Sequence, residues 1–272
     1  MGAKTALLAY ADGDAASALG AAGAPAAEAT ARLVAGVFPG RGAEPAEGDV
    51  LGEVVYPPAE LTYAGSFAGV ELVCDRRLMS VRPSELPAPL HETAAGRRVL
   101  LHAMHSVSDS LTFAVWEDGR LRRSLSLSPD SGVVEDIGDP FPFEAPYWAR
   151  DRPVLLDPQW DDQPCALPFH PLELGNEAPR ALFGFLLEGR PGPEDIDPDE
   201  VPLLGFRLSD PDPDPDSGPG PAHAPETVAR ASRTTRRTRR RVRRPQAAKR
   251  PSRRRVSPCV RPRQDSNLRP SA

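Results

Sequence analysis

Apolar and polar positions alternate most regularly between residues 97 and 128, where the pattern predicts three successive strands. Residues 99–105 are apolar on both faces, which is typical of a central strand that is covered on both sides. Residues 111–116 follow a polar turn, and Asp118-Gly119 then gives a hairpin signal before the third strand. We therefore expect this meander to form the centre of the fold.

The register of the hairpin can be predicted from the side chains that each loop length would bring together. A two-residue loop pairs Phe113 with Ser124 and mixes polar and apolar residues on both faces. A three-residue loop pairs Val115 with Leu121 and leaves one face almost entirely apolar. We expect the three-residue loop, and a structure that pairs Trp116 with Leu121 would contradict it.

Further elements are expected on both sides of the meander. The patterns predict strands at residues 4–11, 49–56, 69–75 and 201–208, and helices within 14–38 and 176–189. The last strand contains Pro202, which is typical of the edge of a sheet. The expected fold class is α+β, a mainly antiparallel sheet with flanking helices, in a single domain over residues 1–209.

Residues 139–171 are rich in proline and aromatic residues, with eight prolines and six aromatic side chains. This composition favours a long loop that wraps the body and inserts its aromatic side chains into the core. An alternative is an aromatic strip that binds a partner, for which Tyr147 and Trp148 are the candidates.

Charge divides the chain into two parts. Residues 1–216 hold 16 Lys and Arg against 36 Asp and Glu, a net charge of −20, whereas residues 217–272 hold 17 against 2, a net charge of +15. An Asp-Pro linker at 210–216 joins the two parts. The tail has almost no bulky apolar residue, so we expect residues 217–272 to be a disordered basic segment.

Two explanations of the basic tail stay open. As a genuine arm it would bind nucleic acid through phosphates. As a frameshifted extension it would reflect translation of GC-rich DNA in another frame, and residues 264–270 resemble the product of translating the antisense strand of a transfer-RNA gene. We favour the frameshift, and an intact mass of the native protein that ends near residue 270 would contradict it.

The chain carries features of a soluble cytoplasmic protein. No apolar run approaches the length that spans a bilayer, and the first residues lead directly into a strand instead of a signal peptide's apolar region. Three widely separated cysteines (Cys74, Cys165 and Cys259) form no CxxC pair, which fits a reducing compartment and argues against a zinc site. We expect no cofactor, no metal and no membrane partner.

Candidate catalytic residues occur at two places, each with a structural explanation beside it. Asp12 and Asp14 stand between a strand and a helix, as in haloacid-dehalogenase-like phosphatases, but the only lysine downstream is Lys249 in the basic tail, and Asp14 also suits a helix cap. His105 and Asp109 could form a base and its orienting carboxylate, although a structural histidine is the commoner case. These four residues define the hypothesis of a metal-assisted hydrolase.

Three residues of the hairpin could form a recognition patch on its polar face. Trp116, Arg120 and Arg122 fall on the same side of the predicted strands and could make cation–π contacts with a partner. Packing of the tryptophan against a connecting loop is the commoner explanation.

Several long phrases of the sequence carry a resemblance to a known family. They are MGAKTALLAYADGD, VLLHAMHSVSDS, FAVWEDGRLRRSLSLSPDSGVVEDIGDPFPFEAPYW and LPFHPLELG with ALFGFLLEGR. Over about residues 1–210 the chain resembles a family of uncharacterised actinobacterial proteins, a domain of unknown function. The resemblance implies no activity. In the family pattern aromatic residues follow the aspartate at the position of Asp109, where this chain has Ser110 and Leu111.

No motif in the sequence identifies an activity, so the molecular function is unknown at this stage. The acidic body, the aromatic loop and the lack of a converging catalytic set favour a small non-catalytic binding or regulatory protein with an unidentified protein partner. The alternatives are the metal-assisted hydrolase and nucleic-acid binding through the basic tail.

Overall fold

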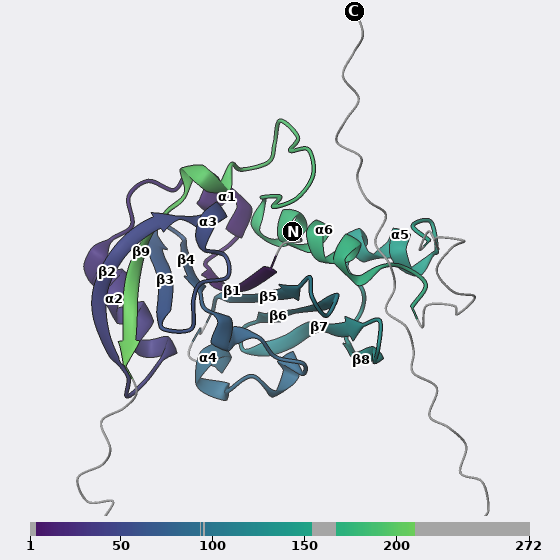
Figure 1. Cartoon of the computed structure of the whole chain (residues 1–272), viewed down its shortest axis with the longest axis horizontal. Coiled ribbons are helices and arrows are strands. Elements are labelled where there is room, and N and C mark those ends of the chain that lie inside the picture. Colours follow the sequence, from purple (N-terminus) through teal and green to yellow (C-terminus); the bar gives the residue numbers. More distant parts are fainter. Residues whose placement is uncertain (1–3, 93, 95, 154–166, 210–272) are drawn as a thin grey trace, which may run out of the picture. The chain divides into compact units, whose positions relative to one another are not determined.

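One antiparallel sheet dominates the computed structural model, which describes residues 4–92, 94, 96–153 and 167–209 (Figure 1). Its strands are β1 (Lys4–Ala11), β2 (Gly42–Val50), β3 (Leu61–Phe67), β4 (Val70–Cys74), β5 (Arg98–His105), β6 (Ser110–Glu117), β7 (Arg120–Ser128), β8 (Gly132–Ile137) and β9 (Pro202–Ser209). The nine strands follow the order β2-β9-β3-β4-β1-β5-β6-β7-β8. The predicted α+β class with a mainly antiparallel sheet is therefore confirmed.

Short helices connect and cover the strands. They are α1 (Ala15–Gly20), α2 (Ala27–Val37), α3 (Leu51–Val54), α4 (Ala88–Glu92), α5 (Ala145–Trp148) and α6 (Pro171–Phe183), with the 3₁₀ turns η1 (Arg76–Leu78), η2 (Pro83–Glu85), η3 (Pro142–Glu144) and η4 (Pro198–Glu200). The predicted linker and tail, residues 210–272, lie outside the described residues, as do Cys165, Cys259 and Trp160.

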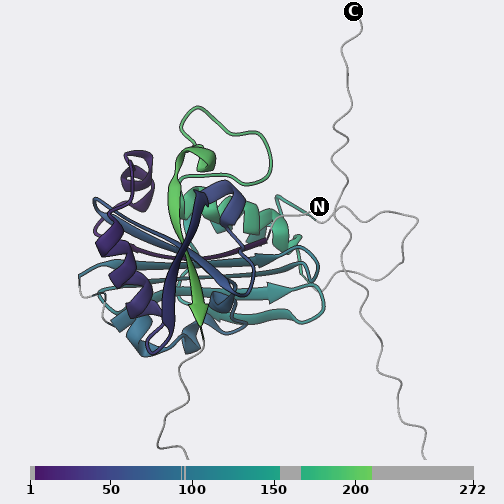
Figure 2. The same ribbon diagram turned by 60° about the vertical axis from the view of Figure 1, so that its left-hand side comes forward.

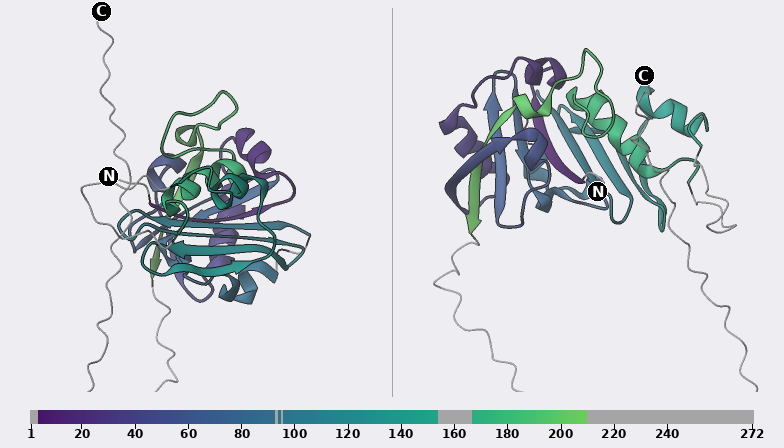
Figure 3. Two further views of the ribbon diagram at one scale, coloured as in Figure 1. Left: turned by 90° about the vertical axis from the view of Figure 1, so that its right-hand side faces the viewer. Right: turned by 45° about the horizontal axis from the view of Figure 1, so that its top comes forward.

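Strand β1 lies at the middle of the sheet, and its two faces are both buried. Ala6, Leu8 and Tyr10 belong to one apolar core, whereas Leu7 and Ala9 belong to another. Helices α2 and α4 cover the first side and α1 and α6 the second, and Figures 1 and 3 show α6 and α4 on opposite sides of the strands. We call these two sides the α2 face and the α6 face.

The sheet is strongly twisted. In Figure 2 strands β2 and β9 run almost vertically, while the strands of the central meander run across the picture. This twist is the usual right-handed twist of β-sheets accumulated over nine strands. Strand β2 forms one edge of the sheet, and its residues are mostly exposed.

The predicted three-residue loop between β6 and β7 is wrong. The observed pairs are Phe113 with Leu125, Val115 with Arg123 and Trp116 with Leu121. Asp118 and Gly119 have φ angles of 51° and 71°, which is the conformation of a two-residue type I′ turn. A bulge at Arg122 shifts the register by one residue beyond the turn, so that apolar side chains still meet on one face.

Two strand predictions also need correction. Residues 49–56 were expected to form a strand but contain the end of β2 and the helix α3, because Leu51 and Val54 pack into the core as a helical turn. Strand β9 is not an edge strand, since it lies between β2 and β3, and Pro202 is tolerated as its first residue. Strands β3 and β8 were not predicted.

Helix α6 begins and ends earlier than the predicted 176–189. His170 caps its first turn by accepting a hydrogen bond from the Leu172 backbone, and Pro171 follows at the first helical position. Gly184 ends the helix in the left-handed conformation with φ of 85°. A side chain at this glycine would come within 2.7 Å of Ala16 in helix α1, so this position also sets how closely the two helices approach.

The described part of the proline-rich segment after β8 packs its aromatic side chains against the α6 face, as the favoured interpretation predicted. Phe141, Phe143, Tyr147 and Trp148 all contact this core, although the segment also forms the short elements η3 and α5. It is anchored by Glu144, which is fully buried. The Arg123 side chain, also fully buried, donates hydrogen bonds to both Glu144 carboxylate oxygens, at 2.9 and 2.6 Å.

Candidate functional site

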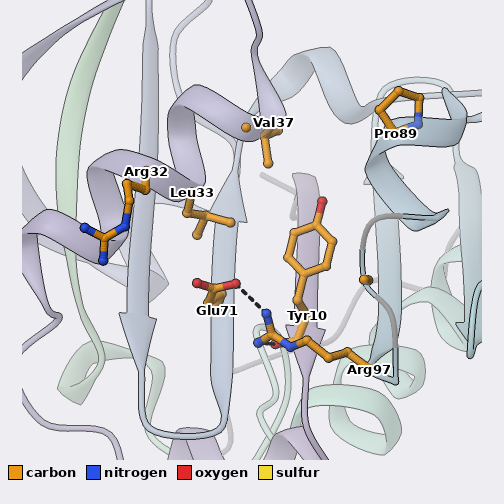
Figure 4. Close-up of a pocket in the computed structure, with 9 residues that line it drawn as sticks. Tyr10, Arg32, Leu33, Val37, Glu71, Pro89 and Arg97 are labelled. Atoms are coloured by element: carbon orange, nitrogen blue, oxygen red, sulfur yellow. Dashed lines mark hydrogen bonds and ion pairs between the residues drawn. The ribbon is translucent and has the colours of Figure 1, made fainter.

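A pocket of about 330 Å³ lies on the α2 face, between helix α2 and the segment that leads into β5 (Figure 4). Its lining residues are Tyr10, Arg32, Leu33, Gly36, Val37, Glu71, Pro89, Ala94 and Arg97. The volume falls within the range of small-molecule sites in proteins. The pocket combines an apolar wall from α2 with a group of polar side chains on the sheet.

Arg97 holds these polar side chains together. Its Nη1 donates to the Glu71 carboxylate at 2.6 Å and its Nη2 donates to the Tyr10 backbone carbonyl at 2.8 Å. Its Nε lies 2.8 Å from the Asp12 carboxylate, as an ion pair without the alignment of a hydrogen bond. One guanidinium therefore links two carboxylates, Asp12 directly after β1 and Glu71 in the adjacent strand β4.

Tyr10 and Glu71 are neighbours because they are paired across β1 and β4. Burial raises the pKa of the Tyr10 phenol, the nearby Glu71 carboxylate raises it further, and Arg97 partly opposes the change. The phenol therefore stays neutral at physiological pH. Its hydroxyl points between Val37 and Pro89, away from the Arg97–Glu71 pair (Figure 4).

The polar groups of the pocket suit binding better than proton transfer. The Glu71 carboxylate already accepts hydrogen bonds from Arg97 and, at 3.3 Å, from the Ser66 hydroxyl. The Tyr10 hydroxyl can donate or accept a hydrogen bond but cannot act as a base while its pKa is raised. The arrangement can hold a small ligand by its shape and by a few hydrogen bonds.

The structure does not bring the four predicted catalytic residues together. Asp12 follows the end of β1 beside Arg98 of β5, whereas His105 pairs with Lys4 at the other end of the same two strands. At about 3.3 Å per residue the two ends are on the order of 20 Å apart. Asp12 instead belongs to the edge of the pocket through its ion pair with Arg97.

The other two candidate carboxylates have local structural roles or separate neighbours. Asp14 caps α1 by accepting hydrogen bonds from the side chain and backbone of Ser17, and these bonds lower its pKa. Asp109 has a left-handed backbone with φ of 48° and lies 3.8 Å from the His170 ring. Among the described residues, no group of three or more His, Cys, Asp or Glu side chains could hold a metal ion.

The proposed recognition patch loses its aromatic member. Trp116 is only 2 % exposed and stacks on the His91 ring at 5.3 Å between centroids, which matches the packing explanation. Arg120 and Arg122 do lie exposed at the turn, and Arg122 forms an ion pair with Glu117 at 3.2 Å.

The two aromatic partner candidates in the proline-rich segment also serve packing. Tyr147 is buried and donates a hydrogen bond to the Glu173 carbonyl at 3.2 Å. Trp148 is half-buried, packs edge-on against Phe169 and donates to the Glu144 carboxylate at 3.2 Å. Both rings therefore pack against the body of the protein.

The sequence analysis did not identify Tyr10, Glu71 or Arg97 as site residues. The available signal was Glu71, a carboxylate in the middle of the apolar strand GVELVCD. A charged residue that is partly buried in a central strand needs a partner, and this partner is Arg97. No local pattern shows that β4 lies beside β1, so the pairing itself could not be read from spacing.

Comparison with known proteins places the chain in a family but gives no activity. No helix in the described part of the chain is long and apolar enough to cross a membrane. Searches of curated proteins and of solved structures gave no match. Residues 5–206, which span almost the entire described sheet and its helices, match one protein family. The chain thus belongs to the Family of unknown function (DUF6928).

Proposed function

We propose that this protein is a non-catalytic binding protein whose pocket between α2 and the sheet holds a small molecule. The observation that carries the proposal is the pairing of an apolar wall with the Tyr10 hydroxyl and the Arg97–Glu71 pair around about 330 Å³. Binding sites typically combine a mainly apolar lining with a few polar groups that orient the ligand.

The ligand that fits best is a small molecule with an apolar body and hydrogen-bonding groups at one end. Leu33, Val37 and Pro89 would contact the apolar body. The Tyr10 hydroxyl and the free lone pairs of the Glu71 carboxylate would bind the polar end. A regulatory role is consistent with such a site, because a ligand that bridges α2 and α4 would fix their relative positions.

A substitution that fills the pocket tests the proposal directly. A side chain at Gly36 meets no atom within 4 Å at its first carbon, so Gly36→Leu can be accommodated on α2 and would occupy the pocket. Ala35→Leu is the matched control, because Ala35 is exposed on the same helix and does not line the pocket.

The experiment is a screen of small neutral and charged fragments against the full chain, followed by saturation-transfer NMR. Fragments that bind the wild-type protein should bind the Ala35→Leu variant equally well and lose binding to the Gly36→Leu variant. A screen in which every bound fragment binds both variants alike would show that this pocket is not the site.

Two predictions from the sequence complete the proposal. We propose a cytoplasmic location, which is supported by the free, buried thiol of Cys74. We also propose that residues 217–272 are a frameshifted extension, supported by their composition, which the intact mass of the native protein would test. Among the described residues, the rings on which a protein-partner role was based are buried (Tyr147 and Trp116) or half-buried (Trp148).

A further inference from the structure

Three basic side chains gather at the opposite end of the α2 face, around the ring of Tyr56. The Arg76 guanidinium lies 4.9 Å and the Lys4 ammonium 5.8 Å from the ring centroid. The His105 ring meets the same tyrosine edge-on at 5.8 Å. We refer to Lys4, Arg76 and His105 as the cationic cluster.

No carboxylate among the described residues balances the cationic cluster. Among the described residues, no Asp or Glu oxygen lies within 4.0 Å of any of the three side chains. This is unexpected in residues 1–216, which carry a net charge of −20 and whose only lysine is Lys4. Neighbouring Arg77, by contrast, is paired with Asp75 at 2.7 Å.

The environment of the His105 imidazole in the cluster is unfavourable. Its Nδ1 atom is buried and has no hydrogen-bond partner. Burial lowers the pKa of the imidazole, and the Lys4 and Arg76 charges lower it further. The two cations beside this ring, Lys4 and Arg76, lack a carboxylate partner among the described residues, and a bound anion would offset their charge.

A second groove on this side of the sheet is lined by seven hydroxyl side chains and by the apolar side chains of Met79, Val81, Leu127 and Val134. Its volume is about 350 Å³ and its hydroxyl side chains are Ser80, Ser108, Ser110, Thr112, Ser126, Ser128 and Ser131. Ser110 is paired directly with His105 across β5 and β6, just as His105 is paired with Lys4 across β5 and β1. The groove and the cluster are therefore neighbours on one face of adjacent strands.

We propose that this end of the α2 face is a binding site for a phosphorylated, hydroxyl-rich small molecule such as a sugar phosphate. The phosphate would bind among Lys4, Arg76 and His105, and the hydroxyl groups of the ligand would lie in the serine-lined groove. This site is separate from the pocket at Tyr10 and does not depend on the function proposed for it.

The chemistry of the two parts fixes the orientation of the ligand. A phosphate dianion accepts charge-assisted hydrogen bonds from lysine and arginine, which are stronger than those between neutral groups. Side-chain hydroxyls can both donate and accept, so they match the hydroxyls of a sugar. Asp130 also lines the groove, and its carboxylate can accept from ligand hydroxyls but would repel the phosphate.

The test compares the affinities of the full chain for inorganic phosphate, glucose 6-phosphate and glucose by isothermal titration calorimetry. Arg76→Met and Lys4→Met should each weaken phosphate and glucose 6-phosphate binding about tenfold, because each removes one charge-assisted contact. The Lys4 side chain makes no hydrogen bond within the described residues, so its variant should fold even if the Arg76→Met variant loses the bond to the Pro57 carbonyl.

Arg120→Met is the matched control, since it removes an exposed arginine from the turn at the start of β7 and leaves the cluster intact. All variants carry the same arginine-rich tail, so the difference between them reports on the cluster alone. Equal weakening by Arg120→Met would overturn the site and indicate general charge attraction.

Ser110→Ala tests the groove. It should lower the affinity for glucose 6-phosphate several-fold, about as expected for one lost hydrogen bond, and leave the affinity for inorganic phosphate unchanged. If glucose 6-phosphate binds no more tightly than inorganic phosphate, the proposal of a hydroxyl-rich ligand is wrong.

Discussion

The two ends of strand β1 on the α2 face differ in whether their basic side chains are paired with carboxylates. At the Tyr10 end, the Arg97 guanidinium lies between two carboxylates, so the cation is balanced within the protein. At the Lys4 end, on the order of 20 Å away along the strand, three basic groups share one tyrosine ring, and no carboxylate in the described part of the chain pairs with them. The charges at the first end are balanced without a bound anion, whereas balance at the second end requires one.

This contrast explains why the two pockets suit different ligands. At the balanced end, a charged ligand would have to displace an existing ion pair, so shape and neutral hydrogen bonds determine what binds. At the unbalanced end, an anion gains electrostatic energy without breaking any contact within the protein. The following substitutions and changes of pH test this contrast.

Acid should have the largest effect, through a residue that belongs to neither end. His102 is fully buried on the α6 face and its ring nitrogens contact the Thr5 hydroxyl at 2.8 Å and the Gly175 carbonyl at 3.0 Å. Burial lowers its pKa to about 4, although the hydrogen bond to Gly175 opposes the change. In the unfolded chain its pKa is about 6.5.

Because the folded pKa lies below the unfolded one, the unfolded chain takes up the proton first as the pH falls. The stability that is present above pH ~6.5 is then lost progressively towards pH ~4, by about 3 kcal/mol in total. Urea unfolding of the wild type and the His102→Gln variant at a series of pH values measures this. Parallel pH profiles for the two proteins would show that His102 is not responsible.

Arg97→Leu should destabilise the balanced end by about 2 kcal/mol, because it leaves the partly buried Glu71 carboxylate and Asp12 without their cation. The double variant Glu71→Gln/Arg97→Leu should recover part of this loss, since it removes the unpaired charge as well. Urea unfolding at neutral pH gives both values. A double variant that is no more stable than Arg97→Leu alone would mean that packing, and not charge balance, is the role of Arg97.

Alkaline pH tests the balanced end through Tyr10. The pKa of its phenol is raised by burial, so the unfolded chain loses this proton first, at pH ~10. Stability should therefore fall above pH ~10, by on the order of 1 kcal/mol at pH ~11 for this residue. The Tyr10→Phe variant should show a shallower decline in urea unfolding above pH ~10, and an unchanged decline would contradict the assignment.

The regular parts of the sheet could be predicted because their information is local. Strand β1 and the meander alternate or run apolar over their whole length, and the structure confirms both. Strand β2 could not be found, because it is exposed on nearly every residue and carries no apolar period. The predicted length of the loop between β6 and β7 was wrong because the bulge at Arg122 changes the register without any signal in the sequence.

The sites depend on strand order, which local patterns do not contain. Alternation along β1 places Lys4 and Tyr10 on one face, but only the pairing of β1 with β4 and β5 brings Glu71 to one end and His105 to the other. Asp12 was found from its motif and lies at the edge of the first pocket for a different reason, its ion pair with Arg97.

The smallest expected effect is the most direct test of the contrast. Lys4→Met removes one of the two like charges of Lys4 and Arg76 from the unbalanced end, so it should leave the protein equally stable or more stable by a few tenths of a kcal/mol at low salt. High salt screens such repulsion and should abolish the gain. Phosphate should then stabilise the wild type more than the Lys4→Met variant, because an anion bound only to the folded state raises its stability. If Lys4→Met instead costs as much stability as Arg97→Leu, Lys4 already has a partner within the protein, and the two ends do not differ in charge balance.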